Sequence, residues 1–153
     1  MRISAKTDYA IRAAAELAAV AGEGWTRTES VAQVQGIPLP FLLNILAELR
    51  AAGLVHSRRG VDGGYRLARP PEEITVADVI RAVDGPLANI AGSLPEEVAY
   101  TGAAIALRET WIALRVQMRS VLERVTLADL ISGRLPEDVT ALLAEEDAWR
   151  ARR

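Results

Sequence analysis

Apolar positions recur every three or four residues through the first third of the chain, the spacing of one helix face. The pattern predicts a helix from about 5 to 21, a short second helix whose N-cap is Thr26 or Thr28, and a third helix from about 38 to 52. The third helix carries one apolar stripe, formed by Leu42, Ile45, Leu46 and Leu49. Gly53 follows that stripe and predicts a left-handed helix end.

A β-hairpin is predicted directly after the third helix. Two short extended segments, 54–59 and 65–69, flank a glycine-rich turn that contains Asp62-Gly63. Three helices followed by a hairpin describe a winged helix-turn-helix domain within a mainly α protein. We assign this domain to residues 1–85 and expect the hairpin to be its wing.

The remainder of the chain is predicted to be mostly helical. It begins with a short helix through about Val83, preceded by the capping-box-like spacing of Thr75 and Asp78. A loop over 86–94, a long helix from about Glu96 to Val125 and a terminal helix over 136–151 follow. The long helix would extend about 45 Å. We therefore expect a second unit, 86–130, and a helical tail, 131–153, whose docking site the pattern does not specify.

The long helix carries two apolar surfaces. One consists of Leu107, Trp111, Leu114, Met118, Val121, Leu122 and Val125, and the other of Ile105, Ile112 and Val116. Two surfaces need two partners, and a module of this size can cover only one of them. We therefore predict a homodimer whose interface is formed by Leu107, Trp111, Leu114, Met118, Val121 and Leu122.

The charge of the chain is unevenly distributed. The net charge is −2, but residues 1–70 hold nine Lys and Arg against six acids, whereas 71–153 hold nine against fourteen. Within 50–69 there are five arginines and one acid. An acidic average therefore conceals a basic patch over the hairpin, which is compatible with binding to DNA.

The chain contains no cysteine, which excludes disulfides, thiolate zinc sites and cysteine-held iron–sulfur clusters. Residues 1–12 are charged throughout and do not match a secretory signal. The longest uncharged run, 30–47, is interrupted by proline, glycine and amide residues, so we expect no membrane contact and a cytoplasmic protein.

Five segments in the same order resemble the Rrf-two (Rrf2) family of bacterial transcription regulators, which includes IscR-, NsrR-, RirA- and CymR-type proteins. They are 1–10 (MRISAKTDYA), 49–55 (LRAAGLV), 57–68 (SRRGVDGGYRLA), 74–85 (ITVADVIRAVDG) and 126–130 (TLADL). The resemblance covers about residues 1 to 130. It implies a homodimeric DNA-binding regulator, a repressor by our interpretation, that reads a pseudo-palindromic operator.

The resemblance and the physics of groove binding together nominate the DNA contacts. They are Arg59, Arg58 and Arg66 on the wing, Leu39, Pro40, Phe41 and Asn44 on the third helix, and Arg2 and Lys6 at the N-terminus. Arg59 matches the family's wing arginine and suits the narrow minor groove, and Asn44 offers a bidentate amide for adenine. Two alternatives stay open: wing arginines that are merely solvated, and Phe41 and Leu43 as part of the core.

Many family members sense iron, nitric oxide or redox state through a cluster held by three cysteines. The matching positions here fall near Ser93, Ala99 and Ile105, with a fourth ligand near Arg108, so the resemblance to a cluster protein fails at the ligands. We expect no metal and no cofactor. The lone histidine, His56, is interpreted as structural or as a neighbour of phosphate.

A small-molecule effector is a further hypothesis. Small residues of the loop, together with Tyr100, Trp111 and Arg108, would leave a cavity beneath the long helix, although tight packing by alanine explains the same residues. The alternative function is a winged-helix protein-interaction module that acts through a partner protein or a small-molecule effector and binds DNA weakly. No nucleophile–base pair or phosphate loop is visible, so we do not expect an enzyme.

Overall fold

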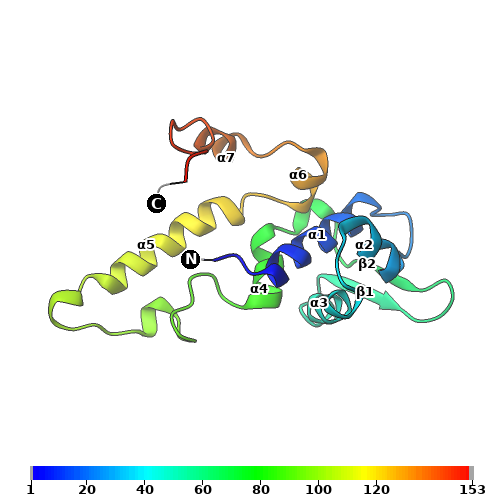
Figure 1. Ribbon diagram of the computed structural model, residues 1–153, viewed down its shortest axis with the longest axis horizontal. Helices are drawn as coiled ribbons and strands as arrows, with labels where there is room; N and C mark the ends of the chain where they lie inside the picture. Colours follow the sequence, from blue (N-terminus) through cyan, green and yellow to red (C-terminus); the bar gives the residue numbers. More distant parts are fainter. Residues whose placement is uncertain (1, 152–153) are drawn as a thin grey trace.

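The computed structural model describes residues 2–151. Its helices are α1 (Ala5–Ala19), α2 (Thr28–Gln35), α3 (Leu39–Ala51), α4 (Val76–Asp84), α5 (Leu107–Leu122), α6 (Leu127–Ser132) and α7 (Glu137–Leu142), and its strands are β1 (Val55–Arg58) and β2 (Gly64–Leu67). Short 3₁₀ helices span Pro71–Glu73, Pro95–Glu97 and Gly102–Ala104. The helix-turn-helix and wing lie at one end of the molecule, and α5 extends away from them (Figure 1). The predicted winged helix-turn-helix fold is confirmed.

Helix α1 is the centre of the core. Its N-cap Ser4 accepts a hydrogen bond from the Thr7 amide, as the sequence suggests. The buried face is built mostly from alanine, formed by Ala10, Ala13, Ala14, Leu17 and Ala18. Small side chains let neighbouring helices approach closely, and α1 packs against α2, α3, α4 and α6.

The apolar stripe of α3 is buried as predicted: Leu42, Ile45, Leu46 and Leu49 are at most 1% exposed. The turn before this helix passes through Gly36 in the left-handed conformation, and Gly53, at φ 75°, ends the segment after it. Burial of this stripe fixes the orientation of α3, and its opposite face is left to solvent.

The expected caps of α2 are wrong. The helix begins at Thr28, its N-cap is Arg27, and no side chain caps it. Thr26 instead forms a β-bridge with Tyr65 of the wing, in which each amide donates to the other residue's carbonyl over 2.8 Å. The capping-box spacing of Thr26 and Glu29 was misleading, because the backbone of Thr26 pairs with the wing instead of starting the helix.

The wing is an antiparallel hairpin in which His56 pairs with Arg66 and Arg58 pairs with Gly64. The bridge to Thr26 fastens β2 to the segment before α2. A Cβ at Gly64 would lie 2.1 Å from the Thr26 carbonyl oxygen, so only glycine permits this approach. The hairpin is therefore held at a fixed position relative to the helix-turn-helix.

Helix α4 has the predicted Thr75–Asp78 capping box, and an equivalent box of Thr126 and Asp129 starts α6, a helix that we did not predict separately. The two helix starts are joined, because the Leu127 amide donates to the Ile74 carbonyl over 2.9 Å. Leu127 is fully buried in the core around α1. The end of the predicted second unit thus contributes to the core of the first.

Two predicted helices are longer than the real ones. Helix α5 has 16 residues, about 24 Å, instead of a start at Glu96. Pro95 and Gly102, with two 3₁₀ helices, interrupt the segment before it. Helix α7 has six residues instead of extending over 136–151, and only Val139 in it is buried. Little packing therefore supports a longer helix there.

No single helix within residues 2–151 is both long and apolar enough to cross a membrane. Only α2 and α3 taken together meet that length and composition, and this pair is bent by 118°.

Candidate nucleic-acid interface

The outward face of α3 exposes an apolar surface with one amide. Phe41 is 59% exposed and Leu43 46%, and Leu39, Pro40 and Asn44 are also exposed. Phe41 and Leu43 therefore do not extend the core. Because Leu42, Ile45 and Leu46 hold the other face in the protein, this surface is free to enter a groove of DNA.

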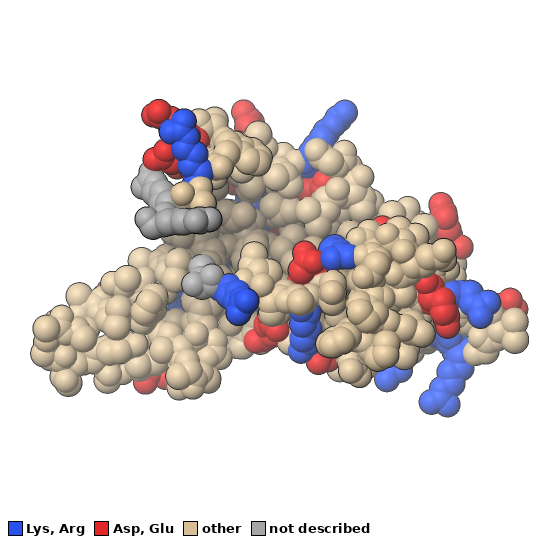
Figure 2. Space-filling view, in the orientation of Figure 1, with Lys and Arg blue, Asp and Glu red and all other residues tan. Residues whose placement is uncertain are grey.

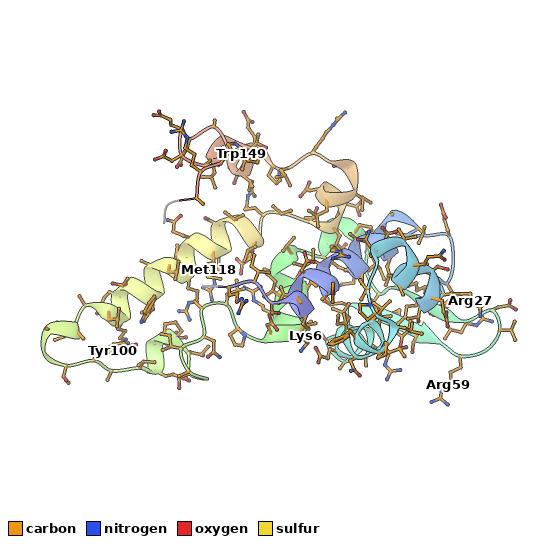
Figure 3. The ribbon with its side chains drawn as sticks, viewed as in Figure 1. Lys6, Arg27, Arg59, Tyr100, Met118 and Trp149 are labelled. Carbon is orange, nitrogen blue, oxygen red and sulfur yellow. The ribbon has the colours of Figure 1, made fainter. Side chains whose placement is uncertain are left out.

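Arg59 stands at the tip of the wing. The turn 60–64 that follows it is closed by the Gly63 amide, which donates to the Gly60 carbonyl over 3.1 Å. Figure 3 shows the Arg59 side chain projecting away from the body of the protein, on the side of the molecule where α3 lies. Arg58 and Arg59 are both exposed, so their guanidinium groups are accessible to a nucleic-acid backbone.

Arg66 is held by an aromatic side chain that sequence reasoning missed. Its guanidinium carbon lies 4.3 Å above the centroid of the Trp25 ring, within cation–π distance. Trp25 precedes the Thr26 bridge, so the same short segment positions the wing backbone and one wing cation. The stacked guanidinium keeps its edge available for a phosphate.

Two further arginines join the wing, and the sequence analysis did not nominate them. Arg27 and Arg50 line a groove of about 320 Å³ together with Arg58 and Arg59. Arg50 donates to the Ser57 hydroxyl over 3.1 Å, which ties the end of α3 to β1. Arg50 belongs to the basic run 50–69, but Arg27 lies far from it in sequence, and only the Thr26 bridge brings it near.

The N-terminal cations lie elsewhere. Lys6 donates to the Val83 carbonyl over 2.6 Å and pairs with Glu48 at 2.9 Å, so it links α1 to α4 and α3. Arg2 lines an apolar cavity beside α5. The structure does not bring these two side chains to the surface formed by α3 and the wing, and their role in DNA binding stays a prediction.

The charges of the wing gather at the right-hand end of the space-filling view, where blue side chains project beyond the surface (Figure 2). Acidic groups interrupt this region, among them Glu29, which lies 4.0 Å from Arg27. Farther from the wing, Arg12 pairs with Asp8 at 2.9 Å, an ion pair between residues four apart on α1. The wing cation Arg27 is held less closely by its carboxylate, at 4.0 Å, than Arg12 is by Asp8.

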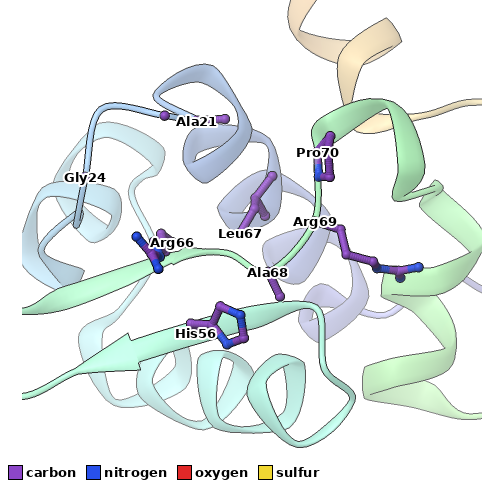
Figure 4. Close-up of a pocket in the computed structure, with 9 residues that line it drawn as sticks. Ala21, Gly24, His56, Arg66, Leu67, Ala68, Arg69 and Pro70 are labelled. Carbon is purple, nitrogen blue, oxygen red and sulfur yellow. The ribbon is translucent and has the colours of Figure 1, made fainter.

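His56 lies at the base of the wing, on the strand next to that of Arg66 (Figure 4). These residues, with Arg69 and Pro70, line an open cavity of about 410 Å³. His56 is exposed, and its backbone pairs with that of Arg66 in the strand register. This placement agrees with a neighbour of phosphate, and among residues 2–151 the histidine belongs to no group of three or more side chains that could hold a metal ion.

The positions that resemble cluster ligands do not fit a cluster. Ser93, Ala99 and Ile105 offer no thiolate, and Ile105 is 69% exposed. Arg108 is a cation, which disfavours a metal ion. Within the described residues, no three His, Asp or Glu side chains gather into a metal site. The donor chemistry of this chain therefore does not match an iron–sulfur centre.

The residues of the candidate effector pocket are only partly assembled. The Trp111 indole donates to the Tyr100 hydroxyl over 3.2 Å, so these two side chains meet. Trp111 and Leu114 line a cavity of about 300 Å³ whose other residues come from the loop at 88–90, and Arg108 does not line it. An apolar effector there stays a prediction.

Helix α5 has no buried residue in the single chain. Its predicted dimerisation residues Leu114, Met118, Val121 and Leu122 line an apolar groove of about 410 Å³, which Ile3 and Ile80 complete. Leu107 and Trp111 lie farther along the same helix and are half-buried. The second surface is more open, with Val116 53% exposed. An open apolar groove of this kind needs a partner.

Comparison with known proteins gives a consistent result. Residues 3–133 match the model of the Rrf2 family, described as an iron-dependent transcriptional regulator. A Mycobacterium tuberculosis protein with a provisional assignment as an HTH-type transcriptional regulator is 49% identical over 99% of this chain and 92% of its own length. CymR, an HTH-type transcriptional regulator of Bacillus subtilis, is 39% identical over 86% of this chain and 91% of its own.

Solved structures agree with these relatives. The structure of B. subtilis CymR, titled the global cysteine regulator of that organism, has a TM-score of 0.73 at 38% identity and covers 87% of this chain and 98% of its own. That of T. potens IscR has a TM-score of 0.70 at 31% identity and covers 100% and 94%.

Proposed function

The chain belongs to the Rrf2 family of transcriptional regulators, and on that premise we propose that it is a sequence-specific DNA-binding repressor that acts as a homodimer on a pseudo-palindromic operator. Its relatives are transcriptional regulators and not enzymes. The observation that carries the proposal is that α3 leaves Phe41 and Leu43 exposed, and that the wing-tip Arg59 projects on the side of the molecule where α3 lies.

The geometry supports a division of labour between the two grooves. The α3 face would enter the major groove, where Asn44 pairs with an adenine edge and Phe41 contacts thymine methyl groups. Arg59 would reach the adjacent minor groove. The groove lined by Arg27, Arg50 and Arg58 would follow the phosphates, which position the protein but carry no sequence information.

The dimer is supported by the unpartnered face of α5. A second copy would fill the apolar groove of Leu114, Met118, Val121 and Leu122 and would place two recognition helices about one helical turn of DNA apart, or a multiple of it. A dimer bound over a promoter excludes other proteins from the grooves that it occupies. Repression is the simplest consequence.

The mechanism of this chain does not include the family's iron chemistry, because its residues do not supply the donors. We propose instead that side chains of the protein and DNA shape determine operator recognition, without a metal cluster. The signal that controls it must therefore reach the protein in another chemical form.

The proposed function is tested by selecting genomic DNA fragments on the purified full-length chain and sequencing those retained. We expect enrichment of one pseudo-palindrome. The Asn44→Ala variant should lose discrimination at one base pair of each half-site, at a cost of about 1–3 kcal/mol, without losing the other positions. Retention of fragments without a common sequence would contradict specific recognition.

The dimer interface is tested by two substitutions on the same helix. Met118→Glu places a charge in the apolar groove and should give a monomer in light scattering after size exclusion. Val116→Glu, on the more exposed surface, should leave the dimer intact. The reverse result would assign dimerisation to the other face of α5.

A further inference from the structure

A second charged site lies outside the DNA-binding surface, between α4 and α5. Arg81 from α4 and Arg115 and Arg119 from α5 line a cavity of about 390 Å³, which Glu96, Pro86 and Leu87 help to enclose. The volume lies in the lower range of ligand pockets. None of these six residues belongs to the proposed DNA contacts or to the apolar groove of α5.

Arg115 is the most buried of the three cations, with 13% of its side chain exposed. It donates to the Glu96 carboxylate over 2.6 Å. Its Nε–H group is shielded from solvent and has no hydrogen-bond partner among residues 2–151. A buried guanidinium N–H without an acceptor is unfavourable, so Glu96 does not satisfy all the donors of Arg115.

Of the other two guanidinium groups, Arg81 is closely paired with a carboxylate, and Arg119 has only a more distant one. Arg81 donates to Glu123 and lies 3.9 Å from Asp78, and Arg119 lies 3.9 Å from the same Glu123 carboxylate. Each guanidinium carries five N–H donors, so the carboxylates at the site use few of them. Three arginines that meet at one cavity are an arrangement that binds carboxylate or phosphate with paired hydrogen bonds.

Glu96 is a displaceable internal ligand. It lies on the short 3₁₀ helix Pro95–Glu97, and its side chain is 45% exposed. A backbone hydrogen bond at Glu96 and the hydrogen bond from Arg115 lower the pKa of its carboxyl. Because the side chain is partly exposed, the carboxylate can turn towards water when a stronger anion takes its place on Arg115.

We propose that this cavity binds a small anion with two carboxylate or phosphate groups, held by Arg81 and Arg119, which both approach Glu123, and by Arg115, which pairs with Glu96. Pro86 and Leu87 face the carbon part of such a ligand. The bound anion bridges α5 and α4, and α4 packs against α1 and α3 of the DNA-binding unit. The site therefore lies where a ligand can act on the position of α5 relative to the helix-turn-helix.

The experiment is calorimetric titration of the full-length protein, without DNA, with four probes: inorganic phosphate, pyrophosphate, succinate and citrate. We expect saturable binding of at least one probe with one site per chain. The comparison of phosphates with carboxylates identifies which of the two sources of anionic groups the site accepts. Absence of saturable binding with all four would overturn the proposal.

Four variants locate the site. Arg119→Gln and Arg81→Gln remove partly exposed cations and should weaken binding of the best probe by about tenfold or more, which corresponds to about 1.4 kcal/mol. Glu96→Gln removes the competing carboxylate and should strengthen binding of the same probe. Arg124→Gln is the matched control, because Arg124 does not line the cavity and forms its own ion pair with Asp138, at a distance of 2.9 Å.

Arg115→Gln is left out because loss of a buried cation can unfold the chain. Equal weakening by Arg124→Gln and Arg119→Gln, or unchanged affinity in Arg119→Gln and Arg81→Gln, would place the anion elsewhere and refute the assignment. Since no arm of the experiment contains DNA, its outcome is independent of the proposed operator binding.

Discussion

Replacing Gly64 with alanine should detach the wing from the helix-turn-helix. The new Cβ would lie 2.1 Å from the Thr26 carbonyl oxygen, whereas real Cβ atoms essentially never come closer than 3.0 Å, so the two segments must separate by about 1 Å. Both Thr26–Tyr65 hydrogen bonds, each 2.8 Å long, would then break. Gly64 also has a φ of +147°, which an alanine adopts only with strain.

The expected cost follows from these terms. Two backbone hydrogen bonds contribute about 2 kcal/mol, and the backbone strain adds about 1–2 kcal/mol. The free energy of unfolding should fall by about 3–4 kcal/mol, a decrease in Tm of about 6–16 °C for a chain of this size. Urea denaturation followed by circular dichroism measures the change in the free energy of unfolding, and thermal denaturation measures the change in Tm.

Gly60→Ala is the matched control. Gly60 also has a positive φ, +107°, but a Cβ there meets nothing within 4 Å, so only the strain of about 1–2 kcal/mol applies. DNA affinity should fall more for Gly64→Ala than for Gly60→Ala, because Gly64 fixes the wing. Equal destabilisation by the two variants would refute the close approach of the wing to Thr26.

Further predictions concern the cation–π pair, the core and a carboxylate. Trp25→Ala should weaken DNA binding through loss of the support for Arg66, by about 1 kcal/mol in a gel-shift titration, and an unchanged affinity would make the contact incidental. Leu46→Ala, at a fully buried site, should lower the free energy of unfolding by about 2–5 kcal/mol in urea denaturation. Because the pKa of Glu96 is lowered in the folded protein, its stabilising contribution is complete above the unfolded pKa and disappears as pH falls through the folded one. Arg119→Gln removes one of the charges that lower this pKa, so an NMR titration of the Glu96 carboxyl should show the pKa rise in that variant.

The sequence pattern was sufficient for elements stabilised by local burial. Leu42, Ile45 and Leu46 recur at helical spacing in the sequence and form the buried face of α3. The Thr75–Asp78 spacing correctly predicted the capping box at the start of α4. The start of α5, predicted at Glu96, was wrong, because the segment before Leu107 contains Gly102 and two 3₁₀ helices instead of a continuous α-helix. Apolar periodicity alone does not detect such breaks.

The candidate site was predictable where charge is contiguous in sequence and not where the fold assembles it. Arg58 and Arg59 were visible in a basic run. Trp25 and Arg27 were not, because the bridge between Thr26 and Tyr65 brings them to the wing from about forty residues away. A short β-bridge outside the hairpin leaves almost no sequence signal.

The central claim, that the α3 and wing surface binds DNA, is tested most directly by fluorescence anisotropy of the full-length protein with a selected DNA duplex at several salt concentrations. The logarithm of affinity should fall linearly with the logarithm of salt. Arg59→Ala should weaken binding and reduce the slope by about one unit, whereas Arg134→Ala, at an exposed arginine in the C-terminal segment, should change neither. An affinity that is weak at every salt concentration, or a slope that is the same in Arg59→Ala, would contradict the claim.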